Sequence, residues 1–204
     1  MNPVNAARFP NCRRLKLESE PFPRASPFRA CTSHVHRVTA RGTGGMICCM
    51  NRPKDSTALF TIGYEQSTPS AFQAALDEAQ VGLLVDVRAV AASRRPGFSK
   101  TALAAGIAEH GVAYVHLRAL GTPKEGRLAA RSGDHDALMR IYDAHLATDP
   151  AKAALEELAE LAQGRRICLM CFERHVEGCH RLRLAEFLCE RLDIGVTHLQ
   201  PAPF

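Results

Sequence analysis

From about Ala58 onward, short apolar runs alternate with stretches that place an apolar residue at every third or fourth position. The runs predict buried strands, and the stretches predict helices that bury one face. We expect strands at 58–63, 81–88, 112–117, 167–171 and 196–199. We expect helices from Pro69, over 100–110, from Asp134, from Asp149 and over 179–192, with a long polar loop at 118–133.

The alternation of strands with helices is typical of an α/β fold. The second strand is apolar on both of its faces until Asp86, as in a parallel sheet that helices cover on both sides. We therefore expect a single domain over 56–204, with a mostly parallel sheet of about five strands and helices on both faces. In such sheets, ligands bind outside the carboxyl ends of the strands.

The first 50 residues have a different composition. They hold eight Lys or Arg, two acidic residues and five prolines, and they show no helical or alternating apolar period. This composition resists a packed core, so 1–55 is expected to be a disordered basic extension. A transit peptide and a nucleic-acid-binding tail both fit the charge, but we favour a third interpretation, a true start of translation at Met46 or Met50.

Charge, apolar runs and cysteine content also indicate the cellular compartment of the protein. The remaining residues carry 18 basic and 19 acidic side chains, so the formal charge of +5 belongs to the N-terminal segment. No apolar run approaches the roughly 20 residues of a membrane helix, and no secretory segment precedes the eight cysteines. The sequence therefore predicts a cytoplasmic protein with free thiols and no membrane partner.

Ionisable side chains follow four successive predicted strands. Because the carboxyl ends of parallel strands meet at one edge, we expect these side chains to line a common site. The predicted substrate-binding residues are Tyr64, Glu65, Asp86, Arg88, Arg94, Arg95, Lys100, His116 and Arg181. The predicted catalytic residues are Cys171, Glu173 and His180.

Cys171 closes an apolar strand and precedes a loop and a helix. A thiol near a helix N-terminus, with Arg174 or Arg181 close by, can have a lowered pKa and act as a nucleophile. The alternative is a buried structural thiol. Cys168 is three residues away on the same strand, so it should face the opposite side of the sheet and form no dithiol with Cys171.

The segment Cys179-His180-Arg181 lies at the start of the last long helix. The free N–H groups of the first helical turn and the guanidinium of Arg181 could bind a phosphate or carboxylate. The segment could also be a solvated capping turn. Cys171, Cys179 and His180 could instead hold zinc, with Glu173 or His116 as a fourth ligand.

Other candidate residues also have structural alternatives. Glu173 is a candidate proton carrier or an ion-pair partner of an arginine. Asp86 fits a structural role in which it accepts backbone N–H groups of the following loop. The basic loop around Arg94, Arg95 and Lys100 could contact phosphates or could simply be solvated.

These residues give the chain a resemblance to a known family, the domain of unknown function 488 (DUF488). The resemblance is carried by Thr61-Ile62-Gly63-Tyr64-Glu65, Asp86-Val87-Arg88, Ser93-Arg94-Arg95-Pro96-Gly97-Phe98-Ser99-Lys100, Tyr114-Val115-His116-Leu117, Cys171-Phe172-Glu173 and Cys179-His180-Arg181. Gln66 stands where related sequences often have glycine, and His175-Val176 replaces a common Asp-Pro. The resemblance implies an α/β fold over 56–204 and no particular activity, and it leaves 1–50 uncovered.

Four functions remain open from the sequence. The leading hypothesis is an enzyme that acts on a small anionic or nucleic-acid-linked substrate, with Cys171 as nucleophile or ligand and Glu173 as proton carrier. The others are a non-catalytic module for phosphate or nucleic acid, a zinc-type site, and sulfur transfer. The last rests on a weaker similarity to rhodanese-like domains, which also place a cysteine after a central strand.

Overall fold

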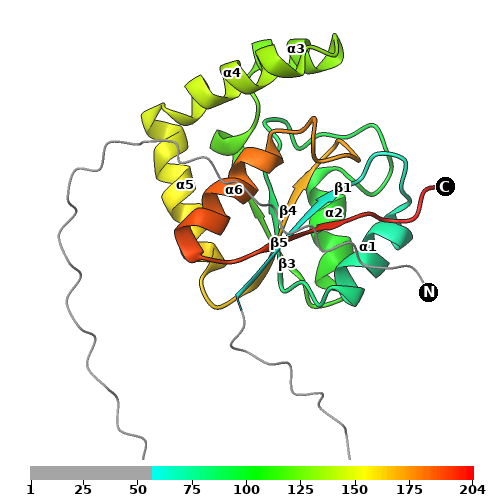
Figure 1. The fold of residues 1–204 in the computed structure, drawn as a ribbon. Coiled ribbons are helices and arrows are strands. Elements are labelled where there is room, and N and C mark those ends of the chain that lie inside the picture. Colours follow the sequence, from blue (N-terminus) through cyan, green and yellow to red (C-terminus); the bar gives the residue numbers. More distant parts are fainter. Residues whose placement is uncertain (1–56) are drawn as a thin grey trace, which may run out of the picture. The chain divides into compact units, whose positions relative to one another are not determined.

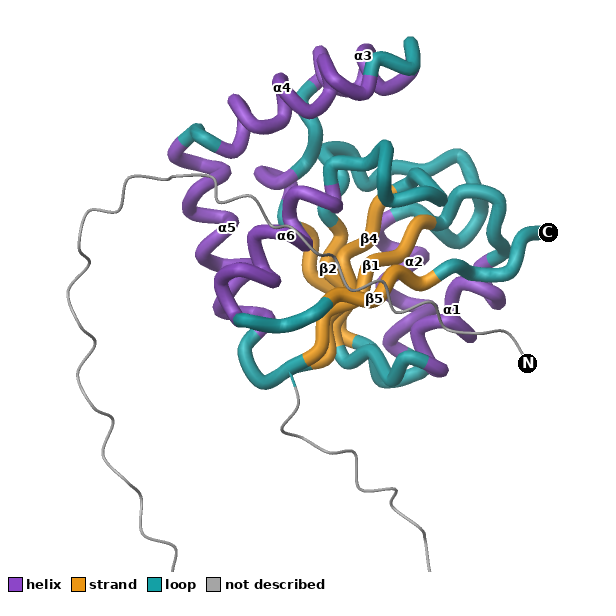
Figure 2. Tube along the Cα trace, in the orientation of Figure 1, coloured by secondary structure: helices purple, strands orange, loops and turns teal. Residues whose placement is uncertain are grey.

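The computed structural model describes residues 57–204, and the structural statements below concern this part of the chain. Its elements form one parallel sheet with helices on both sides (Figure 1; Figure 2). The predicted α/β fold with about five strands is therefore confirmed. The predictions of a disordered extension and of a later translation start fall on residues 1–56, which lie outside the described residues.

The sheet has the strand order β3-β2-β4-β1-β5, and every neighbouring pair is parallel. Its strands are β1 (Ala58–Gly63), β2 (Leu83–Asp86), β3 (Ala113–His116), β4 (Arg166–Cys171) and β5 (Val196–Leu199). The central strand β4 is buried from Ile167 to Cys171, as its unbroken apolar sequence predicts.

Two hydrophobic cores cover the two faces of the sheet. On one face, the helices α1 (Pro69–Glu78) and α2 (Lys100–Ala108) pack through Phe72, Leu76, Leu103 and Ile107. On the other face lie α5 (Asp149–Ala162) and α6 (Arg181–Leu192), which bury Leu158 and Leu184. The 3-10 turn η1 (Arg118–Leu120) and α4 (His135–Leu146) join this second core.

The topology fixes where a crevice is expected. The chain leaves β1 toward α1 on one face, whereas it leaves the adjacent strand β4 toward α6 on the opposite face. This reversal between neighbouring strands is a topological switch point, where ligands bind in open α/β sheets. Gly63 and Cys171 are register partners at the carboxyl ends of these two strands.

One element differs from the prediction. The segment expected to be a long polar loop contains η1 and the helix α3 (Lys124–Arg131). The sequence of α3 did not predict a helix, because the segment is mostly polar and contains Gly126. Its largest apolar residue, Leu128, is exposed in the structure. The helix is held by packing against α4, where Gly126 lies against Leu138 and Ile141. No helix in 57–204 is long and apolar enough to cross a membrane.

Candidate functional site

The cysteine cluster lies at the switch point, on the face of the sheet that α6 covers. Cys171 ends β4, while Cys179 and His180 come directly before the first turn of α6. All three residues are buried, with exposed fractions of 7 %, 1 % and 5 %. Two segments that are separated by the loop 172–178 therefore bring two thiols and an imidazole together.

The two sulfurs and one ring nitrogen of this cluster lie close to one another. The Cys171 and Cys179 sulfurs each lie 3.7 Å from His180 Nδ1, and the three atoms all lie within 4.8 Å of one another. A tetrahedral zinc ion with ordinary Zn–S and Zn–N bond lengths separates its sulfur and nitrogen ligands by roughly 3.6 Å. The observed sulfur–nitrogen spacing therefore suits a metal-ligand set, and it equally suits hydrogen bonds between the thiols and the imidazole.

The second ring nitrogen of His180 fixes its tautomer. His180 Nε2 lies 2.9 Å from the carbonyl oxygen of Val87, which can only accept a hydrogen bond. Nε2 therefore carries a hydrogen atom, and in the neutral ring the lone pair belongs to Nδ1, which faces the two sulfurs. Histidine ligands of metals are held in the same way, by a hydrogen bond from the other nitrogen.

Arg181 is a buried cation that forms no close ion pair with a carboxylate in the described part of the chain, although its charge acts on the Glu173 carboxyl group. Its side chain is 1 % exposed. It donates to the backbone carbonyls of Glu173 and Arg174 and, over 3.4 Å, to the sulfur of Cys179. Its Nε is buried without any hydrogen-bond partner. A buried charge needs compensation, so the cluster favours negative charge on sulfur or on a ligand.

The electrostatic environment shifts the pKa values of the two thiols in opposite directions. A hydrogen bond from Cys179, together with the charges of His180 and Arg181, holds the pKa of Cys171 well below its usual range despite burial. Burial and the neighbouring negative charge of Cys171 raise the pKa of Cys179 well above its usual range. Burial acts to lower the pKa of His180, but the charge and hydrogen bond of Cys171 outweigh it and raise that pKa.

Glu173 lies half-buried in the loop that follows β4. Burial and the negative charges of Cys171 and Glu65 raise the pKa of its carboxyl group. The backbone of this loop is fixed by Arg181 and by Glu65, whose carboxylate accepts the N–H of Arg174 over 3.1 Å. Glu65 therefore organises the loop from the end of β1.

A second polar cluster lies on the opposite face of the sheet, beside α1 and α2. Asp86 is fully buried and accepts hydrogen bonds from Arg88 (2.6 and 2.8 Å) and from the hydroxyl of Tyr114 (2.6 Å). Arg88 also donates to the Tyr64 hydroxyl and to the carbonyl of Phe98. Four of the five N–H groups of this guanidinium are thus used within the protein.

The ionisation of this second cluster follows from the same contacts. Burial opposes the charge of Arg88, but the hydrogen bond and charge of Asp86 raise its pKa above the ordinary value. Burial and the hydrogen bond to Asp86 raise the pKa of Tyr114 as well. The structure thus places Asp86, Arg88 and Tyr64 in a structural network, and their binding of substrate stays a prediction.

The remaining predicted residues surround this network. His116 contacts the carbonyl of Arg88 through Nε2 (2.8 Å), and Arg95 donates to the carbonyls of Tyr64 and Ser67. Arg94 and Lys100 are exposed on the loop before α2 and at its start. The predicted residues therefore form two clusters on two faces of the sheet, which meet at the carboxyl ends of β1 and β4. Cys168 packs on the α1 face, opposite Cys171, as predicted.

The sequence reasoning missed His198 and Thr61. They lie on β5 and β1 and form a 2.8 Å hydrogen bond between Nδ1 and Oγ1. His198 Nε2 is buried without a partner. Burial and the charge of Arg181 lower the pKa of His198. The alternation of β5 would have placed His198 on the same face as Cys171 once the sheet order was known.

Two backbone features hold the loops of the site. A Cβ atom on Gly63 would lie 1.8 Å from the carbonyl oxygen of Glu173, so only glycine lets the loop after β4 cross the end of β1. Gln66, at the position where related sequences often have glycine, has a φ of 56°. The left-handed turn that glycine favours is therefore kept with a larger residue.

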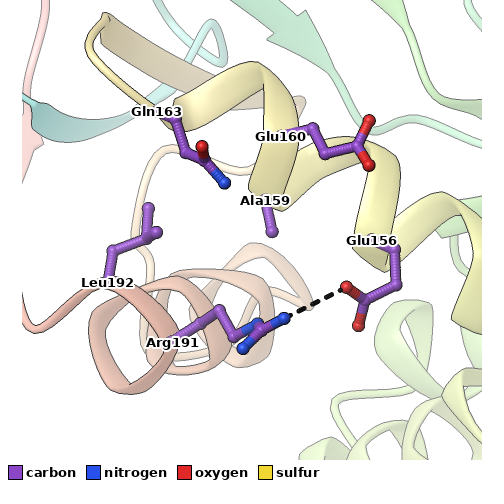
Figure 3. A pocket seen from close by; sticks show the side chains of 6 residues that line it. All are labelled: Glu156, Ala159, Glu160, Gln163, Arg191 and Leu192. Atoms are coloured by element: carbon purple, nitrogen blue, oxygen red, sulfur yellow. Dashed lines mark hydrogen bonds and ion pairs between the residues drawn. The ribbon is translucent and has the colours of Figure 1, made fainter. Parts of the chain in front are cut away.

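A pocket lies elsewhere, between α5 and α6 (Figure 3). It is lined by Glu156, Ala159, Glu160, Gln163, Arg191 and Leu192, and an exposed Arg191–Glu156 pair spans it. The pocket contacts the last turn of α6, whereas the cysteine cluster lies before its first turn. It is therefore not part of the candidate site.

The fold and the site define a parallel α/β protein whose buried cysteine–histidine cluster sits at the switch point of the sheet. The model of the family described as Domain of unknown function DUF488 matches residues 68–188, which is more than half of the chain. The chain therefore belongs to the DUF488 family. No curated protein and no solved structure matches the chain significantly.

Proposed function

We propose that this protein is a metal-dependent enzyme that acts on an anionic substrate. Cys171, Cys179 and His180 are the proposed ligands of a zinc-type cation, and Arg181 is the proposed partner of the anion. The proposal rests on one observation, the convergence of two sulfurs and His180 Nδ1 at metal-ligand spacing. Three protein ligands and one open position are typical of catalytic zinc sites.

The charges of the cluster support an anionic substrate. Two thiolates neutralise a divalent cation, which leaves the buried Arg181 charge without a close ion pair among the described residues. A metal with an open position can polarise a phosphate or carboxylate oxygen, and Arg181 Nε offers a donor that no protein group uses. Glu173, in the loop directly after Cys171, is the proposed proton carrier because it is the closest carboxylate along the chain.

Elemental analysis of the purified protein tests the metal. We expect about one zinc-type ion per chain, and we expect Cys179→Ser and His180→Gln to lose it because three ligands become two. Cys189→Ser is the matched control, since Cys189 lies farther along α6 and outside the cluster. A metal content near zero in the wild type, prepared without chelators, would contradict the proposal.

A second candidate is an enzyme that uses Cys171 as a free nucleophile, including rhodanese-like sulfur transfer. The observation that favours it is the position of the Cys171 sulfur, which lies 3.7 Å from His180 Nδ1 in the same buried cluster as Cys179. A hydrogen bond from Cys179 and the charges of His180 and Arg181 lower the pKa of Cys171 there, which favours the thiolate. In that case metal-free protein should react with iodoacetamide at Cys171 well below pH 8, while Cys179 stays unmodified. Phosphate binding that survives in Cys171→Ala would instead favour a non-catalytic binding module.

A further inference from the structure

Two exposed aromatic side chains lie at the carboxyl edge of the sheet, outside the cysteine cluster. In the described part of the chain, the exposed large apolar residues are Val90, Leu128, Phe172 and Phe204. Phe172 is 39 % exposed and Phe204 is 77 % exposed. Single exposed apolar residues are common on protein surfaces, so exposure alone indicates no function.

These two rings are the ends of one continuous row of contacts, in which aromatic rings contact one another or the guanidinium of an arginine. Phe172 packs edge-on against Tyr64 at 5.3 Å, and Tyr64 stacks on Phe98 at 4.5 Å. The guanidinium of Arg95 lies 6.0 Å from the centre of the Phe98 ring and 5.0 Å from that of Phe204. We call Phe172, Tyr64, Phe98, Arg95 and Phe204 the aromatic row.

The two inner rings of the aromatic row are buried, and its guanidinium is partly exposed and hydrogen-bonded. Tyr64 and Phe98 are 4 % and 1 % exposed. Arg95 is fixed by hydrogen bonds of 3.1 Å to the carbonyls of Tyr64 and Ser67. The exposed rings therefore pack on side chains that are already ordered. A flat ligand that stacks on them would pay little conformational entropy for ordering further side chains.

Positive charge accompanies the aromatic row. The segment 87–100 carries Arg88, Arg94, Arg95 and Lys100 and no acidic residue. Arg94 and Lys100 are exposed, and Arg95 binds neutral carbonyls and forms no ion pair with a described carboxylate. Glu65 and Glu173 are the carboxylates on the Phe172 side, so a polyanion would place its phosphates toward Arg94 and Lys100.

We propose that the aromatic row binds a single strand of nucleic acid, whose unpaired bases stack on Phe172 and Phe204 and whose phosphates contact Arg94 and Lys100. Aromatic rings alternating with cations are the recognition chemistry of single strands, because every base has a face that stacks and every nucleotide carries a phosphate. A duplex hides these base faces. The inference goes beyond the proposed enzyme and does not depend on its metal.

The test uses the full-length protein and a fluorescein-labelled oligothymidine of 12 nucleotides, with binding followed by anisotropy. We expect saturable binding that Phe172→Ala and Phe204→Ala each weaken roughly 5- to 150-fold, the usual contribution of one stacked base. Both side chains are exposed, so these variants should fold. Leu128→Ala is the matched control, because Leu128 is 53 % exposed on α3, and its affinity should equal that of the wild type.

The charge contribution is measured separately. Arg94→Gln and Lys100→Gln should each reduce the slope of log affinity against log salt concentration by about 0.7, the value for one phosphate contact on a single strand. Binding carried by the basic residues 1–50 alone would leave all of these variants unchanged, and that result would overturn the proposal.

Three further outcomes would also overturn it: no saturable binding, a duplex that binds as tightly as the single strand, or thymidine monophosphate that binds as tightly as the oligomer. The last result would make a mononucleotide the ligand. Cys179→Ser separates this inference from the proposed enzyme. If the metal proposal is right, that variant lacks metal and still binds the strand; if only the strand proposal is wrong, the wild type holds metal and binds no strand.

Discussion

At the scale of single residues, Gly63 decides how closely the loop after β4 can approach β1. A side chain there would overlap the carbonyl oxygen of Glu173, which is also an acceptor for Arg181. The loop that carries Glu173 and Arg174 would have to move away. The position of the loop after β4 thus depends on Gly63, a residue that has no side chain.

We therefore expect Gly63→Ala to reduce the free energy of unfolding by about 2–3 kcal/mol or more, because backbone atoms cannot yield as side chains do. Gly106→Ala is the matched control. Nothing lies within 4 Å of a Cβ at that position in α2, so the change should stabilise the helix by about 0.5–1 kcal/mol. Urea denaturation of the two variants and the wild type measures both effects, and equal stabilities would contradict the clash.

His198 gives a pH dependence at the same scale. Burial and the charge of Arg181 lower its pKa in the folded protein below the usual 6.5, so the unfolded chain binds its proton more readily. This contribution to stability is present above pH 6.5 and is lost as the pH falls through the folded pKa. The unfolding free energy of the wild type should thus fall more steeply below pH 6.5 than that of His198→Gln. Parallel curves from denaturant titrations at several pH values would show that His198 does not contribute.

At the scale of elements, the pair formed by Asp86 and Arg88 joins three strands and a loop. Asp86 at the end of β2 accepts from Tyr114 on β3, and Arg88 donates to Tyr64 after β1 and to Phe98 before α2. Because both charges are buried, each depends on the other.

Asp86→Asn should destabilise the protein by about 3–5 kcal/mol, since it leaves the Arg88 guanidinium buried without a counter-charge. The comparison is Asp77→Asn, which breaks the exposed pair of Asp77 with His110 and should cost less than about 1 kcal/mol. Thermal or denaturant unfolding of both variants measures the difference. A loss below 1 kcal/mol in Asp86→Asn would show that the pair is not a structural anchor.

The elements show how far the sequence predicts the fold and the site. The apolar run from Ile167 to Cys171 is sufficient to predict a central strand, and the alternation rule correctly separated Cys168 from Cys171. Side-chain period alone cannot show that Asp86 and Cys171 face opposite sides of the sheet, because this depends on the register of Asp86 with Met170. The structure divides the predicted site residues between the two faces of the sheet, and their action as one site stays a prediction. The helix α3 was missed because its stability comes from tertiary packing.

At the scale of the whole molecule, a metal in the cysteine cluster would link β4 to α6 and, through His180 and Val87, to the segment after β2. A ligand that binds only the folded state stabilises the whole domain. Zinc at a free concentration 100 times its Kd should raise the unfolding free energy by about 2.7 kcal/mol. Chelator treatment should lower the melting temperature of the wild type and leave that of Cys179→Ser unchanged, and a melting temperature insensitive to zinc would count against the centre.

The strand order also has a consequence for biosynthesis. β2 can pair with β3 soon after both have been made, but β1 pairs only with β4 and β5, and its first residue, Ala58, meets Arg166. The middle of the sheet cannot close until residue 171 has left the ribosome, and pairings this distant in sequence form slowly. The apolar β1 segment therefore has no strand partner from its own synthesis until β4 has been made. Unpaired strand edges of this kind favour aggregation, so we expect the nascent chain to be most prone to aggregate before β4 has been made.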